Sequence, residues 1–229
     1  AQLLASAPAG CRSIDFWGLR EDSPTLAALE AAASIANFEA IRELEAVAPA
    51  VDLPDSWDAY LAGLSKKDRH ELRRKIRRFG ALGGGTRVRV ITGGPELAQS
   101  ASILRELMAM SRQDKLEFLR RPQMETFFSR LIDEMGAAGL IRLYLLDLDG
   151  APVAAVLCFV IGNRLYMYNS GYDPSLAPYS VGLVSKAAVI QDAIEQGYDR
   201  VDFLRGDESY KYDLGGQDQR IYRCVLRRR

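Results

Sequence analysis

The chain has 229 residues, of which 48% are hydrophobic, so it is long enough to bury the core of a large domain. Thirty Lys and Arg side chains balance thirty Asp and Glu side chains, which excludes a protein that binds polyanions through its overall charge and confines any basic site to a local patch. The longest apolar run is far shorter than the roughly 20 residues of a membrane-spanning helix, and the chain does not open on a signal-peptide pattern.

The three cysteines indicate the redox environment. Cys11, Cys158 and Cys224 are odd in number and widely spaced, which favours free thiols in a reducing compartment over a disulfide framework. We therefore expect a cytoplasmic protein. Because the first residue, Ala1, is not a methionine, we also expect further sequence upstream of it.

The first fifty residues predict a strand, a helix and an extended segment. "CRSIDFWGL" alternates as a strand, an alanine-rich helix begins near Ser23, and a strand-like return ends at "VDLPDSW". Such a segment is too small to bury its own core. We expect a partial N-terminal lobe over residues 1–53 and a complete domain over residues 54–229.

A strongly basic helix lies near the start of the second domain, after the short helix "DSWDAYLAGL". Ser65 and Asp68 form the S-x-x-D pattern of a capping box in front of "KKDRHELRRKIRRFG". The helix has one apolar stripe, and most of its other positions are Lys or Arg. Arg73, Arg74 and Arg77 could face an anionic ligand or surface, or form a merely solvated face.

The middle of the chain alternates between strand and helix patterns. "TRVRVIT" predicts a strand, and the two helices after it are joined by the polar segment "QDKLEFLR". Three strand patterns follow, and the second, "APVAAVLCFVIG", is apolar throughout, as in a strand buried on both faces. We expect a three-stranded meander, then a helix, the strand "RVDFLRG" and the final strand "QRIYRCVLRRR".

Several common catalytic motifs are missing from the sequence. It contains no Walker loop, no dinucleotide-binding glycine motif, no Cys or Cys/His metal cluster and no G-x-S-x-G elbow. His70 is the single histidine and lies on the exposed side of the basic helix, where it is poorly placed for a catalytic triad. We expect neither a metal nor nucleophile–histidine chemistry.

A candidate anion site lies in "GYDPSLAPYSVGLVSKAAV". After two prolines, the helix opens on residues that leave its first amides unblocked, and its dipole favours an anion there. Alternatively, Ser180 is an ordinary N-cap and Gly182 a packing glycine. The candidate donor-binding residues are Tyr179, Ser180, Val181, Gly182 and Leu183.

Charged residues gather where the strand in "VDFLRGDESYKYDLGG" ends. Phe203 is expected to turn toward the core and Arg205 to emerge at the strand end, where ligands often meet a sheet. A structural ion-pair cluster is the alternative. The candidates in this stretch are Asp202, Arg205, Asp207, Glu208, Tyr210 and Lys211.

Three stretches together resemble a known family. "LSKKDRHELRRKIRRF", "GYDPSLAPYSVGLVS" and "DFLRGDESYKYDLGG", in this order, are similar to the CelD-like branch of the GNAT superfamily of acyltransferases, which is related to the FemAB peptidoglycan transferases. The resemblance runs from Pro54 to the C-terminus. It implies an α/β lobe with a central mixed sheet whose strands splay apart, flanked by helices.

A similarity between two segments of the chain extends this expectation to the N-terminal part. "SIDFWGLREDSP" and "RVDFLRGDESY" share a strand, an Asp-Phe pair and a turn with an arginine and two acidic residues. We therefore expect the GNAT-like lobe to be preceded by the remnant of a second, related lobe.

The resemblance also implies a donor. In GNAT enzymes an acyl-CoA such as acetyl-CoA lies in the gap between the strands, which here places its pyrophosphate on the helix that opens at Ser180. The chain departs from the usual pattern, because Gly182 is a single glycine where most members have two small residues. In the FemAB relatives the donor is an aminoacyl-tRNA, and Tyr210-Lys211 followed by Gly215-Gly216 resembles their aromatic-lysine pair.

The function implied is an acyltransferase acting on an amine or hydroxyl of a sugar, a peptide or an envelope or polysaccharide precursor, with no DNA partner. A tRNA-dependent aminoacyl transferase and a non-catalytic glycan- or partner-binding lobe are the alternatives, and peripheral contact with a membrane surface fits the basic helix.

The charged residues at the end of the strand in "VDFLRGDESYKYDLGG" are expected to carry the catalytic roles. Lys211 would stabilise the oxyanion, and Asp207 or Glu208, with a pKa raised by burial, would accept or position the nucleophile's proton. Arg205 would hold the turn or clamp an anionic acceptor, and Tyr210 would pack as an aromatic wall or protonate the leaving group. The candidate acceptor-binding residues are Asp202, Tyr168, Tyr172, Arg73, Arg74 and Arg77.

Overall fold

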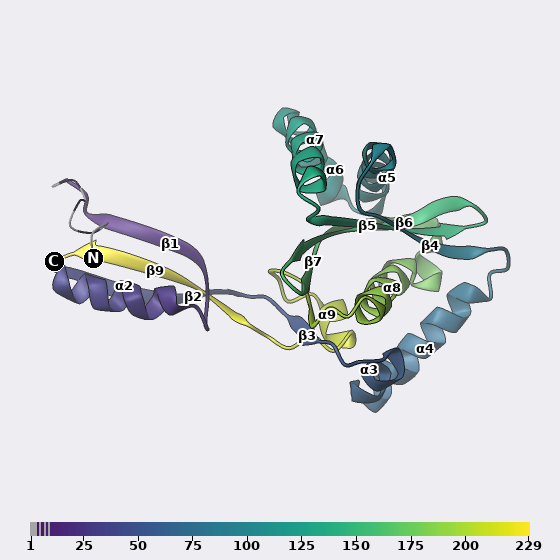
Figure 1. The fold of residues 1–229 in the computed structure, drawn as a ribbon, viewed down its shortest axis with the longest axis horizontal. Helices are drawn as coiled ribbons and strands as arrows, with labels where there is room; N and C mark the ends of the chain where they lie inside the picture. The colour runs from purple at the N-terminus through teal and green to yellow at the C-terminus, as the bar shows by residue number, and fades with distance from the viewer. Residues whose placement is uncertain (1–3, 5, 7, 9) are drawn as a thin grey trace. The chain divides into compact units, whose positions relative to one another are not determined.

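The computed structural model describes residues 4, 6, 8 and 10–229, so residues 1–3, 5, 7 and 9 of the expected N-terminal lobe lie outside the described part (Figure 1). The chain divides into two compact units, and both contain segments that are distant in sequence. The expected division into lobes at residue 53 stays a prediction. The first unit comprises Ala1–Pro49, Arg205–Glu208 and Gln217–Arg229, and the second comprises Ala50–Leu204 and Ser209–Gly216.

The first unit is built on a three-stranded antiparallel sheet. Its central strand is the last strand of the chain, which pairs with an N-terminal strand on each side in the order β1-β9-β2. The sequence pattern predicts this last strand but not its partners, because alternation does not encode long-range pairing. The elements are β1 (Ser13–Arg20), α2 (Pro24–Ile35), β2 (Phe38–Val47) and β9 (Arg220–Arg228).

Helix α2 covers one face of this small sheet. It begins after Ser23, whose hydroxyl accepts a hydrogen bond from the amide of Thr25 and so caps the helix. Ala33 on the helix and Phe38 and Leu226 on the strands are almost completely buried in the shared core. The small alanine side chains let the helix lie close to the sheet.

The second unit contains a six-stranded mixed sheet in the order β3-β8-β7-β6-β5-β4. The predicted meander is confirmed, since β5, β6 and β7 are consecutive antiparallel neighbours. Only β7 and β8 run parallel among the strands described here. The strands are β3 (Ala50–Asp52), β4 (Thr86–Ile91), β5 (Ile141–Leu148), β6 (Ala151–Ile161), β7 (Arg164–Tyr172) and β8 (Arg200–Asp202).

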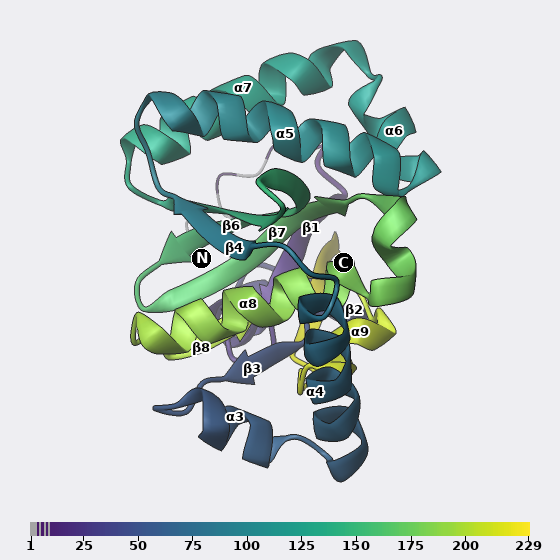
Figure 2. The same cartoon turned by 90° about the vertical axis from the view of Figure 1, so that its right-hand side faces the viewer.

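Helices cover both faces of this sheet, with α5, α6 and α7 on one side and α8 on the other (Figures 1 and 2). The polar segment expected to link two helices is itself a short helix, α6, because Phe118 and Leu119 pack onto the core beneath α5 and α7. The helices are α3 (Trp57–Gly63), α4 (Lys66–Gly80), α5 (Pro95–Ser111), α6 (Gln113–Leu119), α7 (Pro122–Ala137), α8 (Val181–Glu195), α9 (Ser209–Asp213) and the 3-10 helix η1 (Pro174–Tyr179).

Strand β6 shows why its sequence is apolar throughout. Ala155 and Leu157 belong to the core under α5 and α7, whereas Val156 and Cys158 belong to the core under α8. All four are buried, so the predicted two-faced burial is confirmed. The result is the predicted fold class, a mixed sheet flanked by helices.

The parallel pair is short, and the two strands part at one end. Pairing runs only from Arg164 opposite Arg200 to Tyr166 opposite Asp202, while β7 continues to Tyr172. The strand predicted over "RVDFLRG" therefore ends at Asp202. Ligands of open α/β sheets bind outside the carboxyl ends of the strands, so a site is expected at this end of β7.

Candidate functional site

A pocket of about 210 Å³ opens where helix α8 begins. Its walls come from the end of β7, from η1, from the first turns of α8 and from α9, so tertiary packing assembles it from segments that are separate in sequence. The lining residues are Tyr172, Ala177, Ser180, Val181, Gly182, Leu183, Lys186 and Tyr210.

The start of α8 has an unusual backbone. Ser180 adopts the left-handed conformation, with φ 58° and ψ 33°, and its carbonyl accepts hydrogen bonds from the amides of Leu183 at 2.9 Å and Val184 at 3.0 Å. Its hydroxyl makes no capping hydrogen bond within the described part of the chain, so Ser180 is not an ordinary N-cap. The amides of Val181 and Gly182 belong to the first turn, where the helix itself supplies no acceptor.

Gly182 packs against an aromatic ring. A β-carbon on Gly182 would lie 3.0 Å from Cδ1 and 3.1 Å from Cε1 of Tyr172. The absence of a side chain therefore lets the ring lie directly on the first turn of α8. This supports the packing role for Gly182.

Lys186 is a pocket residue that the sequence analysis missed. It is only 9% exposed, its Nζ donates a hydrogen bond to the carbonyl of Gly182 at 3.0 Å, and Nζ lies 4.8 Å from the ring centroid of Tyr210. Its position in the sequence could have indicated this role. Lys186 is the one basic residue in α8, and it follows Gly182 by four positions, which places both on the same side of the helix.

Asp202 and Lys211 both bind the backbone of Leu204. The carboxylate of Asp202 accepts a hydrogen bond from the Leu204 amide at 2.7 Å, and Nζ of Lys211 donates to the Leu204 carbonyl at 2.9 Å. Leu204 has φ 58°, a conformation that a strand cannot continue. Lys211 is 1% exposed and is not among the described residues that line the pocket, whereas its neighbour Tyr210 is.

The turn after β8 belongs to the first unit. Arg205 donates from Nη1 to Oε1 of Glu45 at 2.6 Å, and the Glu45 side chain is 8% exposed. Asp207 and Glu208 are both exposed, so neither has the burial on which the expected role as proton acceptor rested. The catalytic roles of Arg205, Asp207 and Glu208 stay predictions.

The structure separates the two tyrosines that were expected to bind the acceptor. Tyr168 is the extra residue of a β-bulge in β7 and packs against Phe159, with ring centroids 5.1 Å apart, on the side of α5 and α7. Burial raises the pKa of its phenol. Tyr172 instead faces α8 and lines the pocket. Only Tyr172 is therefore brought together with the donor-binding candidates.

The remaining candidates lie beside the pocket or on the surface. Tyr179 is not among the lining residues that the structure describes, and its ring contacts the guanidinium of Arg78 at 5.3 Å from the centroid, which joins η1 to α4. Arg73, Arg74 and Arg77 are exposed on α4, and Arg74 forms an ion pair with Glu71 at 2.7 Å.

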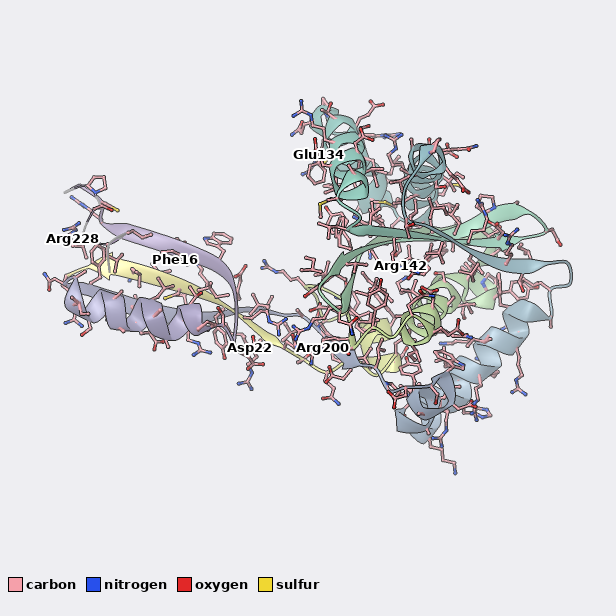
Figure 3. All side chains as sticks on the ribbon, viewed as in Figure 1. Phe16, Asp22, Glu134, Arg142, Arg200 and Arg228 are labelled. Atoms are coloured by element: carbon pink, nitrogen blue, oxygen red, sulfur yellow. The ribbon has the colours of Figure 1, made fainter. Side chains whose placement is uncertain are left out.

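A buried polar network fixes α8 to the sheet. Arg142 reaches from β5 toward α8 (Figure 3) and donates to Oδ2 of Asp192 at 2.9 Å. The hydroxyl of Tyr144 donates to the same oxygen at 2.7 Å, and burial raises the pKa of this phenol. These bonds position the helix whose first turn forms the pocket.

Three further properties follow from the described residues. No group of three or more His, Cys, Asp or Glu side chains among them could hold a metal ion. None of their helices has the length and apolar content that a membrane crossing requires. All three cysteines are free thiols, as predicted.

The chain belongs to the family described as "Acetyltransferase (GNAT) domain", whose pattern matches residues 66–212, more than half of the sequence. This stretch begins at α4 and includes the pocket, Tyr210 and Lys211. The sequence has no match among the curated proteins.

Solved structures show the same fold at low sequence identity. FemX is 12% identical, with a TM-score of 0.65 over 93% of this chain and 72% of its own. The C-terminal domain of a putative lysylphosphatidylglycerol synthetase from Agrobacterium fabrum is 13% identical, with a TM-score of 0.62 over 95% of this chain and 68% of its own. L-PGS from Bacillus licheniformis is 15% identical, with a TM-score of 0.58 over 93% and 67%. The GNAT family predicted from the sequence is confirmed, and the similarity to FemX is a similarity of fold.

Proposed function

We propose that this protein transfers an acyl group from acyl-CoA to an amine or hydroxyl of a sugar, peptide or envelope precursor. The observation that carries the proposal is the pocket at the start of α8, located where β7 has run past its pairing with β8. A pocket at such a divergence is where a sheet of this kind binds its ligand. Membership of the GNAT family supports the reaction class.

The pocket fits an anionic donor group such as a pyrophosphate. The amides of Val181 and Gly182 lie at the positive end of the α8 dipole, and the ammonium of Lys186 adds a full charge beside them. Tyr172 and Tyr210 supply aromatic walls for the apolar part of the donor. Each of these five residues lines the pocket. Val181 is fully buried, so its amide reaches an anion only if the start of α8 shifts, whereas the other four residues keep some exposed surface.

The reaction needs few groups from the protein. The nucleophile's nitrogen or oxygen bonds to the acyl carbonyl carbon, the carbon–sulfur bond breaks, and the thiol leaves with a proton. Lys211 is proposed to favour the oxyanion, because a buried ammonium near the end of β8 acts across low-dielectric surroundings. Tyr210 is proposed to give the leaving thiolate its proton, because it lines the pocket, and the proton that the nucleophile loses then restores the phenol.

Calorimetry can test the donor. Acetyl-CoA should bind, and S-acetylpantetheine, which lacks the pyrophosphate, should bind at least tenfold more weakly because it forfeits the contacts at α8. Lys186→Met should weaken acetyl-CoA binding and leave S-acetylpantetheine binding unchanged. Equal affinity for both compounds would contradict the assignment of the pyrophosphate to this pocket.

An aminoacyl-tRNA donor is the second candidate. Two observations favour it. First, α8 opens with a single glycine, and this glycine packs against Tyr172. Second, the similar structures include FemX and a putative lysylphosphatidylglycerol synthetase. Transfer of a radiolabelled amino acid from charged tRNA to an envelope precursor, with no turnover of acetyl-CoA, would establish it over the first candidate.

A further inference from the structure

Helix α4 has more cations than its surroundings neutralise. Its 15 residues include eight Lys or Arg, and only two acidic residues accompany them. Both acids are engaged, since Asp68 accepts a hydrogen bond from the Ser65 hydroxyl at 2.6 Å and Glu71 pairs with Arg74. The excess positive charge of α4 therefore remains on the surface.

The cations without partners are exposed and aligned. Four side chains of α4 are exposed and have no hydrogen-bond or ion-pair partner among residues 4, 6, 8 and 10–229: Lys66, Lys67, Arg73 and Arg77. At 3.6 residues per turn, Lys66, Arg73 and Arg77 lie within roughly 40° of one another around the helix axis. We call these three residues the cationic row; it extends over about 16 Å along the helix.

The apolar side of α4 is already used. Leu72 is 1% exposed and Phe79 is 2% exposed, and both pack into the cores beside α8. Helix α4 packs against α8 and η1 within the second unit, and Figure 2 shows it along the border of that unit. Helix α4 therefore has no free apolar face that could insert into a membrane or a partner protein. It can interact with a partner only through its charged side chains.

We propose that α4 docks this protein on a surface of anionic lipid headgroups. A cluster of four or more Lys and Arg on an amphipathic helix is sufficient for electrostatic attraction to such a surface. The buried apolar stripe makes the contact shallow and reversible, in contrast to helices that embed their apolar face. The proposal is independent of acyl transfer, because it involves neither the pocket nor Lys211.

The charge distribution favours lipid over nucleic acid. Proteins that bind a phosphodiester backbone typically neutralise about six to ten phosphates. The cationic row with Lys67 offers four unpartnered cations on one helix, and the whole chain has a net charge of zero. Attraction to a lipid surface grows with each basic residue near it and does not need a matching track of phosphates.

Vesicle co-sedimentation tests the proposal. The protein should sediment with vesicles that contain phosphatidylglycerol in phosphatidylcholine, and stay in solution with phosphatidylcholine alone. At an ionic strength of 1 M, where the Debye length is about 3 Å, it should be released. The variant Lys66→Gln/Arg73→Gln/Arg77→Gln should lose at least tenfold in partition coefficient, at roughly the cost of three basic residues at an anionic surface.

A matched variant controls for net charge. Arg120→Gln/Arg130→Gln/Arg164→Gln also removes three exposed cations from the second unit, but none from α4, and should partition like the wild type. Thermal unfolding of both variants confirms that each is folded. Equal partitioning of the two variants, or binding to single-stranded RNA that exceeds vesicle binding and disappears in the α4 variant, would overturn the proposal.

Discussion

Asp202 and Lys211 bind the two polar backbone groups of one residue, Leu204, at 2.7 Å and 2.9 Å. A buried carboxylate and a buried ammonium thus fix a left-handed residue at the point where β8 stops pairing with β7. The charge that follows the strand therefore has a structural role in addition to any catalytic one. Experiments on Lys211 must separate the two roles.

Replacement of Lys211 by methionine should lower both stability and turnover. The variant leaves the half-buried Leu204 carbonyl without this donor, which costs about 1–3 kcal/mol of unfolding free energy. If Lys211 also favours the oxyanion, kcat should fall by about a hundredfold or more. Denaturant unfolding measures the first effect, and steady-state kinetics far below the melting temperature measures the second.

The two effects can be told apart by a second variant. Tyr144→Phe removes a half-buried hydrogen bond to Asp192 in the same unit, which does not involve Leu204, and should cost a similar free energy of unfolding. If Tyr144→Phe loses as much kcat as Lys211→Met, the loss reflects general destabilisation. A normal kcat in folded Lys211→Met would leave the lysine with only its structural role.

Enlargement of Gly182 should disturb the pocket through Tyr172. Valine at this position would press its methyl groups against a ring that already lies 3.0 Å from the position of the β-carbon. We expect at least tenfold weaker acetyl-CoA binding by calorimetry, because the displaced ring would alter the wall of the pocket. Gly93→Val, where a β-carbon would meet open space, is the matched control and should bind normally.

A compensating change shows whether the ring is responsible. In Gly182→Val/Tyr172→Leu, the smaller side chain should relieve the contact and recover part of the acetyl-CoA affinity lost by Gly182→Val alone. No recovery would indicate that valine blocks the ligand directly and that the packing explanation is wrong.

Lys186 should contribute mainly through its charge. Lys186→Met retains the buried stem but removes the ammonium next to the first amides of α8, so the affinity for an anionic donor should fall by about tenfold. Lys186→Arg keeps the charge and should retain most of the affinity. The wild-type affinity should also decrease with salt more steeply than that of Lys186→Met; parallel salt dependences would exclude a direct electrostatic role.

Local sequence patterns predicted the helices and strands whose formation depends on neighbouring residues. The S-x-x-D pattern predicted the start of α4, where the amide of Asp68 donates to the Ser65 hydroxyl at 3.1 Å. The apolar run of β6 predicted burial on both faces of the sheet. In each case the determining contacts lie within a few residues or follow from the alternation of side chains along a strand.

Features that depend on distant segments escaped the sequence analysis. The pairing of β9 with β1 and β2 joins the two ends of the chain, and no alternation encodes it. The end of β8 is stabilised by Lys211, seven residues after Leu204, and the bulge at Tyr168 breaks the alternation of β7, which no local pattern indicates. The pocket was predicted in part, because the start of α8 has a local signature whereas Lys186 acquires its role only through packing against Tyr210.

The three thiols should differ sharply in reactivity. Burial raises the pKa of the Cys158 and Cys224 thiols above the usual range, and neither side chain is accessible in the folded protein. Because the thiolate is the reactive species, a raised pKa lowers the reactive fraction at neutral pH, and that fraction should stay small as the pH rises to mildly alkaline values. Cys11 is half-buried and should be alkylated first. Mass spectrometry after iodoacetamide treatment should find Cys11 modified in the native protein and all three modified in denaturant. Labelling of native Cys158 as fast as Cys11 would mean that the sheet of the second unit opens readily, contrary to the packing of β6 between two helical layers.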